Sequence, residues 1–177
     1  MKMKNFIPVV FLAFFLLIGG CKKEVDIPTF GCHDLDSPRS NLNTDYHDST
    51  CVYMYVSEFE ITYFEDKSWD PLNPLFDEAD IVLKFGDANM DSIYFDSYRI
   101  TDADATERHT WVAHTQFQLK NQLYAWELHN EATVLFLESD ELMTSGLLNP
   151  LDFKNDSVIV MTDSIQNTQI KIRYEIR

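Results

Sequence analysis

Short segments in which apolar and polar side chains alternate constrain this chain more than any other feature of the sequence. In the clearest segment, residues 169–176, apolar side chains stand at every second position from Ile170 to Ile176, with Lys171, Arg173 and Glu175 between them. Residues 59–64 alternate in the same way. A period of two is typical of a β-strand with one buried face and one wet face.

Candidate strands recur at short intervals along the chain. They are residues 59–64, 80–85, 93–98, 111–119, 123–128, 133–137, 158–161 and 169–176. No stretch of helical period is long enough to cover a sheet, and only short helical turns are expected near residues 103–108 and 141–148. The pattern predicts an all-β fold, an eight-stranded antiparallel β-sandwich.

The first 20 residues form a leader that is not part of this fold. Lys2 and Lys4 precede an apolar run over residues 6–18, which is too short to span a bilayer comfortably and is typical of a signal peptide. Residues 18–21, Ile-Gly-Gly-Cys, resemble the lipobox of bacterial lipoproteins. The resemblance implies cleavage before Cys21 and acylation of that cysteine, including palmitate. Several acyl chains give a stable membrane anchor.

Residues 21–50 are expected to form the lipidated cysteine and a polar, turn-rich tether, with residues 51–177 as the β-sandwich domain. The sequence after the anchor, Cys-Lys-Lys-Glu, looks like lipoproteins of the Bacteroidetes. We therefore expect an outer-membrane lipoprotein of the cell envelope, with its periplasmic or surface face open.

Two further cysteines, Cys32 and Cys51, lie within and at the end of the tether. In an exported protein a leftover pair is most simply a disulfide. A zinc site is the alternative, with His33 and His47 joining the two cysteines, since two thiolates and two imidazoles can form a tetrahedral shell. The spacing matches no zinc motif and the compartment is oxidising, so the disulfide is favoured.

Charge and composition exclude several classes of partner. The chain has 177 residues, 45% hydrophobic, which suits one globular domain. It carries 29 acidic and 14 basic residues; without Lys2 and Lys4 the mature domain stands at −17. This balance argues against nucleic acid and against unaided binding to anionic lipid, because both need basic patches.

The first predicted strand is followed by an acidic loop with a Trp69-Asp70 pair, then by residues 80–83, Asp-Ile-Val-Leu. Later strands lead to residues 134–140, Val-Leu-Phe-Leu-Glu-Ser-Asp, and to the alternating last strand. This order of elements resembles the C2 domain, the eight-stranded calcium- and phospholipid-binding sandwich first defined in protein kinase C. The resemblance covers about residues 52–177 and implies a C2-like fold.

The same resemblance implies where calcium binds. In that family the ion lies between two loops at one end of the sandwich, held by aspartates. The matching positions here are Asp80, Glu138 and Asp140, with Asp70 or Asp77 as the earlier ligand from the first loop. Calcium takes six to eight oxygen ligands, so carboxylates on adjacent loops suit it. Glu138 departs from the usual aspartate, and Asp70 and Asp80 are further apart than usual, which leaves an unoccupied acidic end as the alternative.

The acidic loop also holds apolar side chains that are unusual for an exposed connection: Trp69, Leu72, Pro74, Leu75 and Phe76. One interpretation places Leu75 and Phe76 under the loop as an extension of the core. The other makes Trp69 a partner- or membrane-facing tip beside the acidic residues.

The sequence offers little support for catalysis. It contains no Gly-x-Ser-x-Gly elbow, phosphate loop, dinucleotide signature or His-Glu-x-x-His motif, and its five histidines fall singly. We therefore expect a non-enzymatic, lipid-anchored envelope module that binds an unknown envelope protein or glycan, with calcium at the loop end. A metal-free adhesion or carbohydrate-associated sandwich is the alternative, and an exported hydrolase a third.

Overall fold

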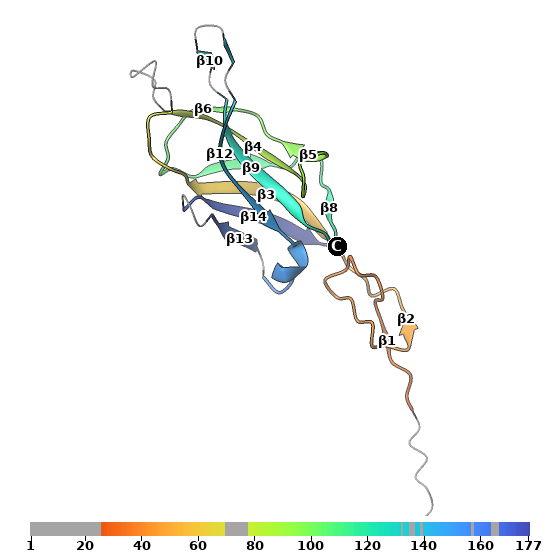
Figure 1. Ribbon diagram of the computed structural model, residues 1–177. Coiled ribbons are helices and arrows are strands. Elements are labelled where there is room, and N and C mark those ends of the chain that lie inside the picture. The colour runs from red at the N-terminus through yellow and green to blue at the C-terminus, as the bar shows by residue number, and fades with distance from the viewer. Residues whose placement is uncertain are drawn as a thin grey trace, which may run out of the picture.

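The computed structural model describes residues 26–69, 78–131, 133–134, 137–138, 140–156, 158–163 and 167–177. Within these residues two antiparallel sheets of five strands each pack face to face (Figure 1). The described residues contain no α-helix, only the short 3-10 helix η1 (Pro150–Phe153). No helix among them is long and apolar enough to cross a membrane. The predicted antiparallel β-sandwich is confirmed.

The first sheet has the strand order β13-β14-β3-β7, and β8 also pairs with β3. Its strands are β3 (Met54–Tyr63), β7 (His109–Val112), β8 (Gln118–Leu119), β13 (Val158–Thr162) and β14 (Gln169–Ile176). The second sheet has the order β12-β9-β4-β5, and β6 also pairs with β4. Its strands are β4 (Ala79–Asp87), β5 (Ile93–Asp96), β6 (Ile100–Ala103), β9 (Tyr124–Asn130) and β12 (Glu141–Leu148).

The core lies between the sheets because every second side chain of each central strand points inward. On β4 the inward residues are Ala79, Ile81, Leu83 and Phe85, all buried. Phe59 of β3 meets Phe85 across the core, with ring centroids 5.3 Å apart. Alternation on β3 is interrupted at Ser57, which has no partner between the pairs Glu58–Arg173 and Val56–Tyr174. This bulge lets Val56 and Phe59, three residues apart, both face the core.

Three local expectations from the sequence are corrected. Residues 141–148 form the edge strand β12 rather than a helical turn, because β9 offers them a free side for pairing. Residues 133–137 are not one strand, since β10 (Thr133–Val134) pairs back on β11 (Leu137–Glu138) as a hairpin. The expected strand over 111–119 is divided into β7 and β8, which both pair with β3.

Residues 26–51 form a small lobe at the end of the sandwich where the chain terminates (Figure 1). Its strands β1 (Phe30–Gly31) and β2 (Tyr46–His47) are parallel, and Cys32 and Cys51 form a disulfide. The expected disulfide is thus confirmed, and the zinc alternative loses both thiolates to it. Hydrogen bonds between described residues join the lobe to the rest of the domain: Tyr53 to Asp34, Val52 N–H to Ser37, and Asn121 N–H to Asp36.

Candidate functional site at the loop end

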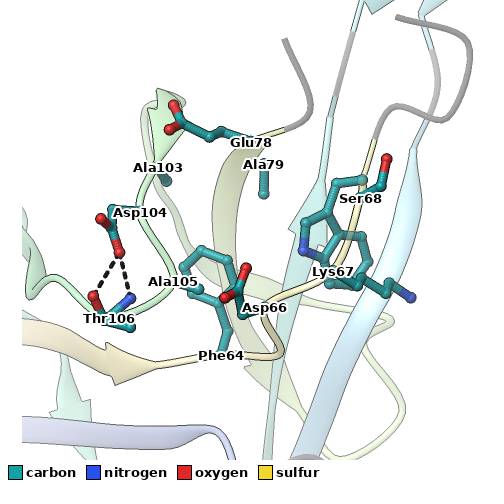
Figure 2. Close-up of a pocket in the computed structure, with 11 residues that line it drawn as sticks. Phe64, Asp66, Lys67, Ser68, Glu78, Ala79, Ala103, Asp104, Ala105 and Thr106 are labelled. Atoms are coloured by element: carbon teal, nitrogen blue, oxygen red, sulfur yellow. Dashed lines mark hydrogen bonds between the residues drawn. The ribbon is translucent and has the colours of Figure 1, made fainter. Parts of the chain in front are cut away.

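The opposite end of the sandwich holds a pocket of about 380 Å³. We define the loop end by the described residues that line it (Figure 2): Phe64, Asp66, Lys67, Ser68, Trp69, Glu78, Ala79, Ala103, Asp104, Ala105 and Thr106. Backbone pairing sets its geometry, because Ala79 pairs with Ala103 and the Phe64 N–H donates to the Ala105 carbonyl at 3.3 Å. The turn after β6 is thereby held beside the end of β3.

Carboxylates outnumber cations around this pocket. Asp66, Glu78 and Asp104 contribute three carboxylates, and Lys67 contributes the single cation among the described lining residues. The Lys67 amine lies 3.9 Å from the centre of the Trp69 ring and within 4 Å of carboxylates of Glu65 and Glu141. The pocket therefore suits a cationic group better than an anionic one.

Asp104 keeps its charge for a local reason. Its carboxylate accepts hydrogen bonds from the hydroxyl and the backbone N–H of Thr106, both at 2.7 Å (Figure 2). These bonds hold the pKa of Asp104 below its ordinary value. At neutral pH the negative charge is thus fixed in place at one side of the pocket.

Trp69 corrects one sequence prediction. The side chain is only 5% exposed and packs in the core, and its indole N–H donates to the Glu65 carbonyl at 3.1 Å. The predicted partner- or membrane-facing tip at Trp69 is therefore wrong. Trp69 lines the pocket. It is buried there because a ring of this size gains more free energy from burial than from exposure to water.

Asn130 is a residue that the sequence reasoning missed. It is buried at the end of β9, where its amide donates to the Trp69 carbonyl at 3.3 Å and accepts from the Asp80 N–H at 2.9 Å. One side chain thus ties together the two described flanks of residues 70–77. A single asparagine after an apolar strand gives no signal of this role in the sequence.

The described members of the predicted calcium set do not face this pocket. Asp80 stands one residue out of phase with the inward positions of β4, and its carboxylate lies 3.9 Å from Arg99 and accepts from the Asp102 N–H. Asp140 lies 3.4 Å from the Lys84 amine and is hydrogen-bonded to His129. Both carboxylates therefore belong to the outer face of the second sheet.

A continuous charged network links these two residues across that outer face. The carboxylate of Glu131 lies 2.9 Å from the Lys84 amine and 4.0 Å from the Arg99 guanidinium. It thereby connects the Lys84–Asp140 pair to the Arg99–Asp80 pair. Burial would raise the pKa of Asp140, but its bonds to His129 and Lys84 outweigh burial and lower it. Basic side chains thus occupy the neighbourhood where a cation would have to bind.

The side chains of the remaining predicted ligands are not described by the structure. Asp70 and Asp77 lie outside the described residues, and of Glu138 only the backbone in β11 is described. Among the described residues, no three acidic, histidine or cysteine side chains form a group able to hold a metal ion. Asp80 and Asp140 do not fit a shared calcium site, and the other three positions stay a prediction.

Comparison with known proteins identifies the fold. No family model matches the chain, and neither does any curated protein. Among solved structures, human GIVD cytosolic phospholipase A2 in complex with methyl gamma-linolenyl fluorophosphonate inhibitor and terbium chloride aligns with 72% of this chain at 16% identity and a TM-score of 0.50. BON1-C2B aligns with 71% of this chain at 10% identity and a TM-score of 0.48, over 92% of its own length.

The chain spans about 17% of that phospholipase, and the matched portion is the C2 part. The class of protein that the two sheets define is therefore a C2-like antiparallel β-sandwich, as the sequence predicts. At this identity the likeness concerns the fold alone.

Proposed function

We propose that this chain is a lipid-anchored, non-enzymatic binding module of the bacterial cell envelope. Acylated Cys21 holds it in the membrane, and the sandwich presents its loop end to a partner. The leader and the Ile-Gly-Gly-Cys sequence support the anchor. The fold supports a scaffold for binding, since C2-like sandwiches carry their variable loops at the ends.

The observation that carries this proposal is the arrangement of the lobe and the pocket at the two ends of the molecule. The lobe of residues 26–51 and the segments after β3 and β6, which line the acidic pocket, lie at opposite ends of one sandwich (Figure 1). Hydrogen bonds from Tyr53, Val52 and Asn121 hold the lobe against the sandwich. In this proposal the loop end points away from the membrane that carries the anchor, and its ligand is a cationic group on an envelope partner rather than the anchoring bilayer.

Calcium is not needed for this proposal. Asp80 and Asp140 already have basic partners, so calcium would have to displace Arg99 or Lys84 to reach them. A calcium-dependent form of the function rests on Asp70, Asp77 and Glu138 alone.

The test is to express the full chain in a bacterium and label it with an alkyne analogue of palmitate. We expect label in the wild-type protein and none in Cys21→Ala, which should leave the membrane fraction. Orientation is then measured with single thiols, Glu107→Cys at the loop end and Asn43→Cys in the lobe, each carrying a fluorophore in vesicles that contain a lipid acceptor. Since Cys21 is acylated and Cys32 and Cys51 are paired, each introduced thiol is the only free one.

Energy transfer should be stronger from position 43 than from position 107. Unlabelled wild-type protein would refute the anchor. Equal transfer from both positions, with the label present, would refute the orientation while leaving the anchor intact.

A further inference from the structure

A second concave surface lies far from the loop end, at the sandwich edge where β5 faces β7 and β8. It consists of two adjoining hollows of about 310 and 240 Å³ that share one residue, Tyr94. We call this surface the aromatic groove. Its described lining is Tyr94, Phe95, Asp96, Ser97, Tyr98, Val112, His114, Thr115, Phe117, Gln118, Lys120, Gln122 and Tyr124.

A β-bulge directs Tyr94 into the groove. Phe85 pairs with Phe95 and Gly86 pairs with Ile93, so Tyr94 is the extra residue between two ladder pairs. Bulges re-aim a side chain and are common beside binding sites. Gly86 permits this one, because a Cβ there would lie 2.5 Å from the Ser92 carbonyl oxygen. The exposed position of Tyr94 is therefore built into the backbone.

The Tyr94 ring rests on other aromatic rings that belong to the core. Its centroid lies 6.0 Å from Phe117 and 5.8 Å from Tyr124, and both of those rings contact Phe85. Tyr94 is nevertheless 43% exposed, and Tyr98 at the other side of the groove is 63% exposed. The Tyr98 backbone is fixed too, since its carbonyl accepts from the Trp111 indole at 2.9 Å. Supported, half-exposed rings lose little entropy when a ligand packs on them.

Polar groups surround these rings and almost none is charged. Gln118, Gln122 and Thr115 supply two amides and a hydroxyl, which both donate and accept hydrogen bonds, whereas the Ser97 hydroxyl donates to the Tyr98 carbonyl and accepts from the Leu83 N–H. Among the described lining residues, Asp96 supplies one negative charge and Lys120 one positive charge, and there is no other Asp, Glu, Lys or Arg. A patch balanced in charge stands out on a chain with 29 acidic and 14 basic residues.

We propose that the aromatic groove binds a neutral glycan, with Tyr94 and Tyr98 packing against the C–H faces of sugar rings and the amides and hydroxyls bonding to sugar hydroxyl groups. Aromatic platforms flanked by a few polar groups are the usual construction of small-ligand sites. Charge balance in the groove selects neutral sugars over uronic acids or sulfated glycans, which the net negative charge of the whole chain repels. A peptide added to the sheet edge fits less well, because the bulge at Tyr94 interrupts the ladder that such a strand needs.

The experiment measures sugar binding by titration calorimetry on the full lipidated chain in phosphatidylcholine nanodiscs. The probes are cellohexaose, xylohexaose, laminarihexaose and mannohexaose, with hexagalacturonate as the charged counterpart. We expect at least one neutral hexaose to bind and hexagalacturonate not to bind. Tyr94→Ala should weaken binding at least about tenfold, because the platform is lost.

Two matched variants separate stacking from general effects. Tyr94→Phe keeps the ring and should stay within about threefold of wild type. Tyr63→Ala removes an exposed tyrosine at the far end of β3 and should leave binding unchanged. The proposal is overturned if no neutral hexaose binds, if hexagalacturonate binds more tightly, or if Tyr94→Ala binds as well as wild type. The glycan proposal does not depend on the loop end, so the result of this experiment is independent of whether the loop end binds a partner.

Discussion

At the scale of single residues, Glu60 shows how the outer face of the first sheet is held together. It lies on β3 yet is only 2% exposed, because Lys171 and Arg173 of β14 and Arg108 cover its carboxylate at 3.0, 3.2 and 3.3 Å. Burial alone would raise the pKa of Glu60, but the hydrogen bonds from Lys171 and Arg173 outweigh it, and the pKa lies below the ordinary value. The charged form is thus the one the fold stabilises.

This arrangement fixes the sign of a pH dependence. A carboxyl whose pKa is lower in the folded than in the unfolded protein stabilises the fold above its unfolded pKa, about 4.3, and that contribution is lost as pH falls through the folded value. We expect Glu60→Gln to lower the free energy of unfolding by about 1–3 kcal/mol at pH 7 and to flatten its decline in acid. Glu58→Gln, at the more exposed neighbouring pair with Arg173, should cost less than about 1 kcal/mol. Urea unfolding from pH 7 to pH 3 measures both, and equal losses would contradict the special role of Glu60.

At the scale of elements, the contact between β9 and β12 depends on a glycine. Gly146 pairs with Trp126, and a Cβ at Gly146 would lie 2.5 Å from the indole nitrogen. Trp126 is buried, so its ring has little room to move. Gly146→Ala should therefore cost about 1–3 kcal/mol of stability and change the near-ultraviolet circular dichroism. Gly31→Ala is the control, since its Cβ would meet a methyl group of Thr44 in the lobe. Similar small losses in both variants would show that Trp126 yields.

Two strands, β14 and β12, show how far the sequence alone could predict the elements. The alternation at residues 169–176 identifies β14, in which Ile170 and Ile172 are buried while Arg173 and Glu175 on the other face are exposed. β12 escapes this test, since the bulge between Leu142 and Thr144 places Met143 and Thr144 both inward. At the candidate site, Trp69 stands out in the sequence, but the direction of its side chain does not follow from its neighbours. Its backbone carbonyl is held by the amide of Asn130, which lies 61 residues later and carries no local signal.

The scale of the whole molecule governs its response to salt and calcium. Residues 21–177 carry a formal charge of −17, so the folded state is opposed by self-repulsion that salt screens. Asp80 and Asp140, the described members of the predicted calcium set, are paired with Arg99 and Lys84 on the outer face of the second sheet. Because the charges repel one another and Asp80 and Asp140 are already paired, we expect any salt to raise the stability of the fold by screening, with no specific effect of calcium.

Thermal melts of the chain from Lys22 onward test this in sodium, magnesium and calcium chloride at equal ionic strength, each against EDTA. We expect the midpoint to rise with ionic strength and to be the same for calcium and magnesium, because screening depends on charge and not on coordination. A ligand specific to the native state would behave differently, adding about 2.7 kcal/mol at a hundredfold excess over its dissociation constant. A calcium-specific rise that vanishes in Asp80→Asn with Glu138→Gln would contradict the pairing of Asp80 and place a metal at Asp80 and Glu138. A calcium-specific rise that survives the double substitution would instead direct attention to Asp70 and Asp77.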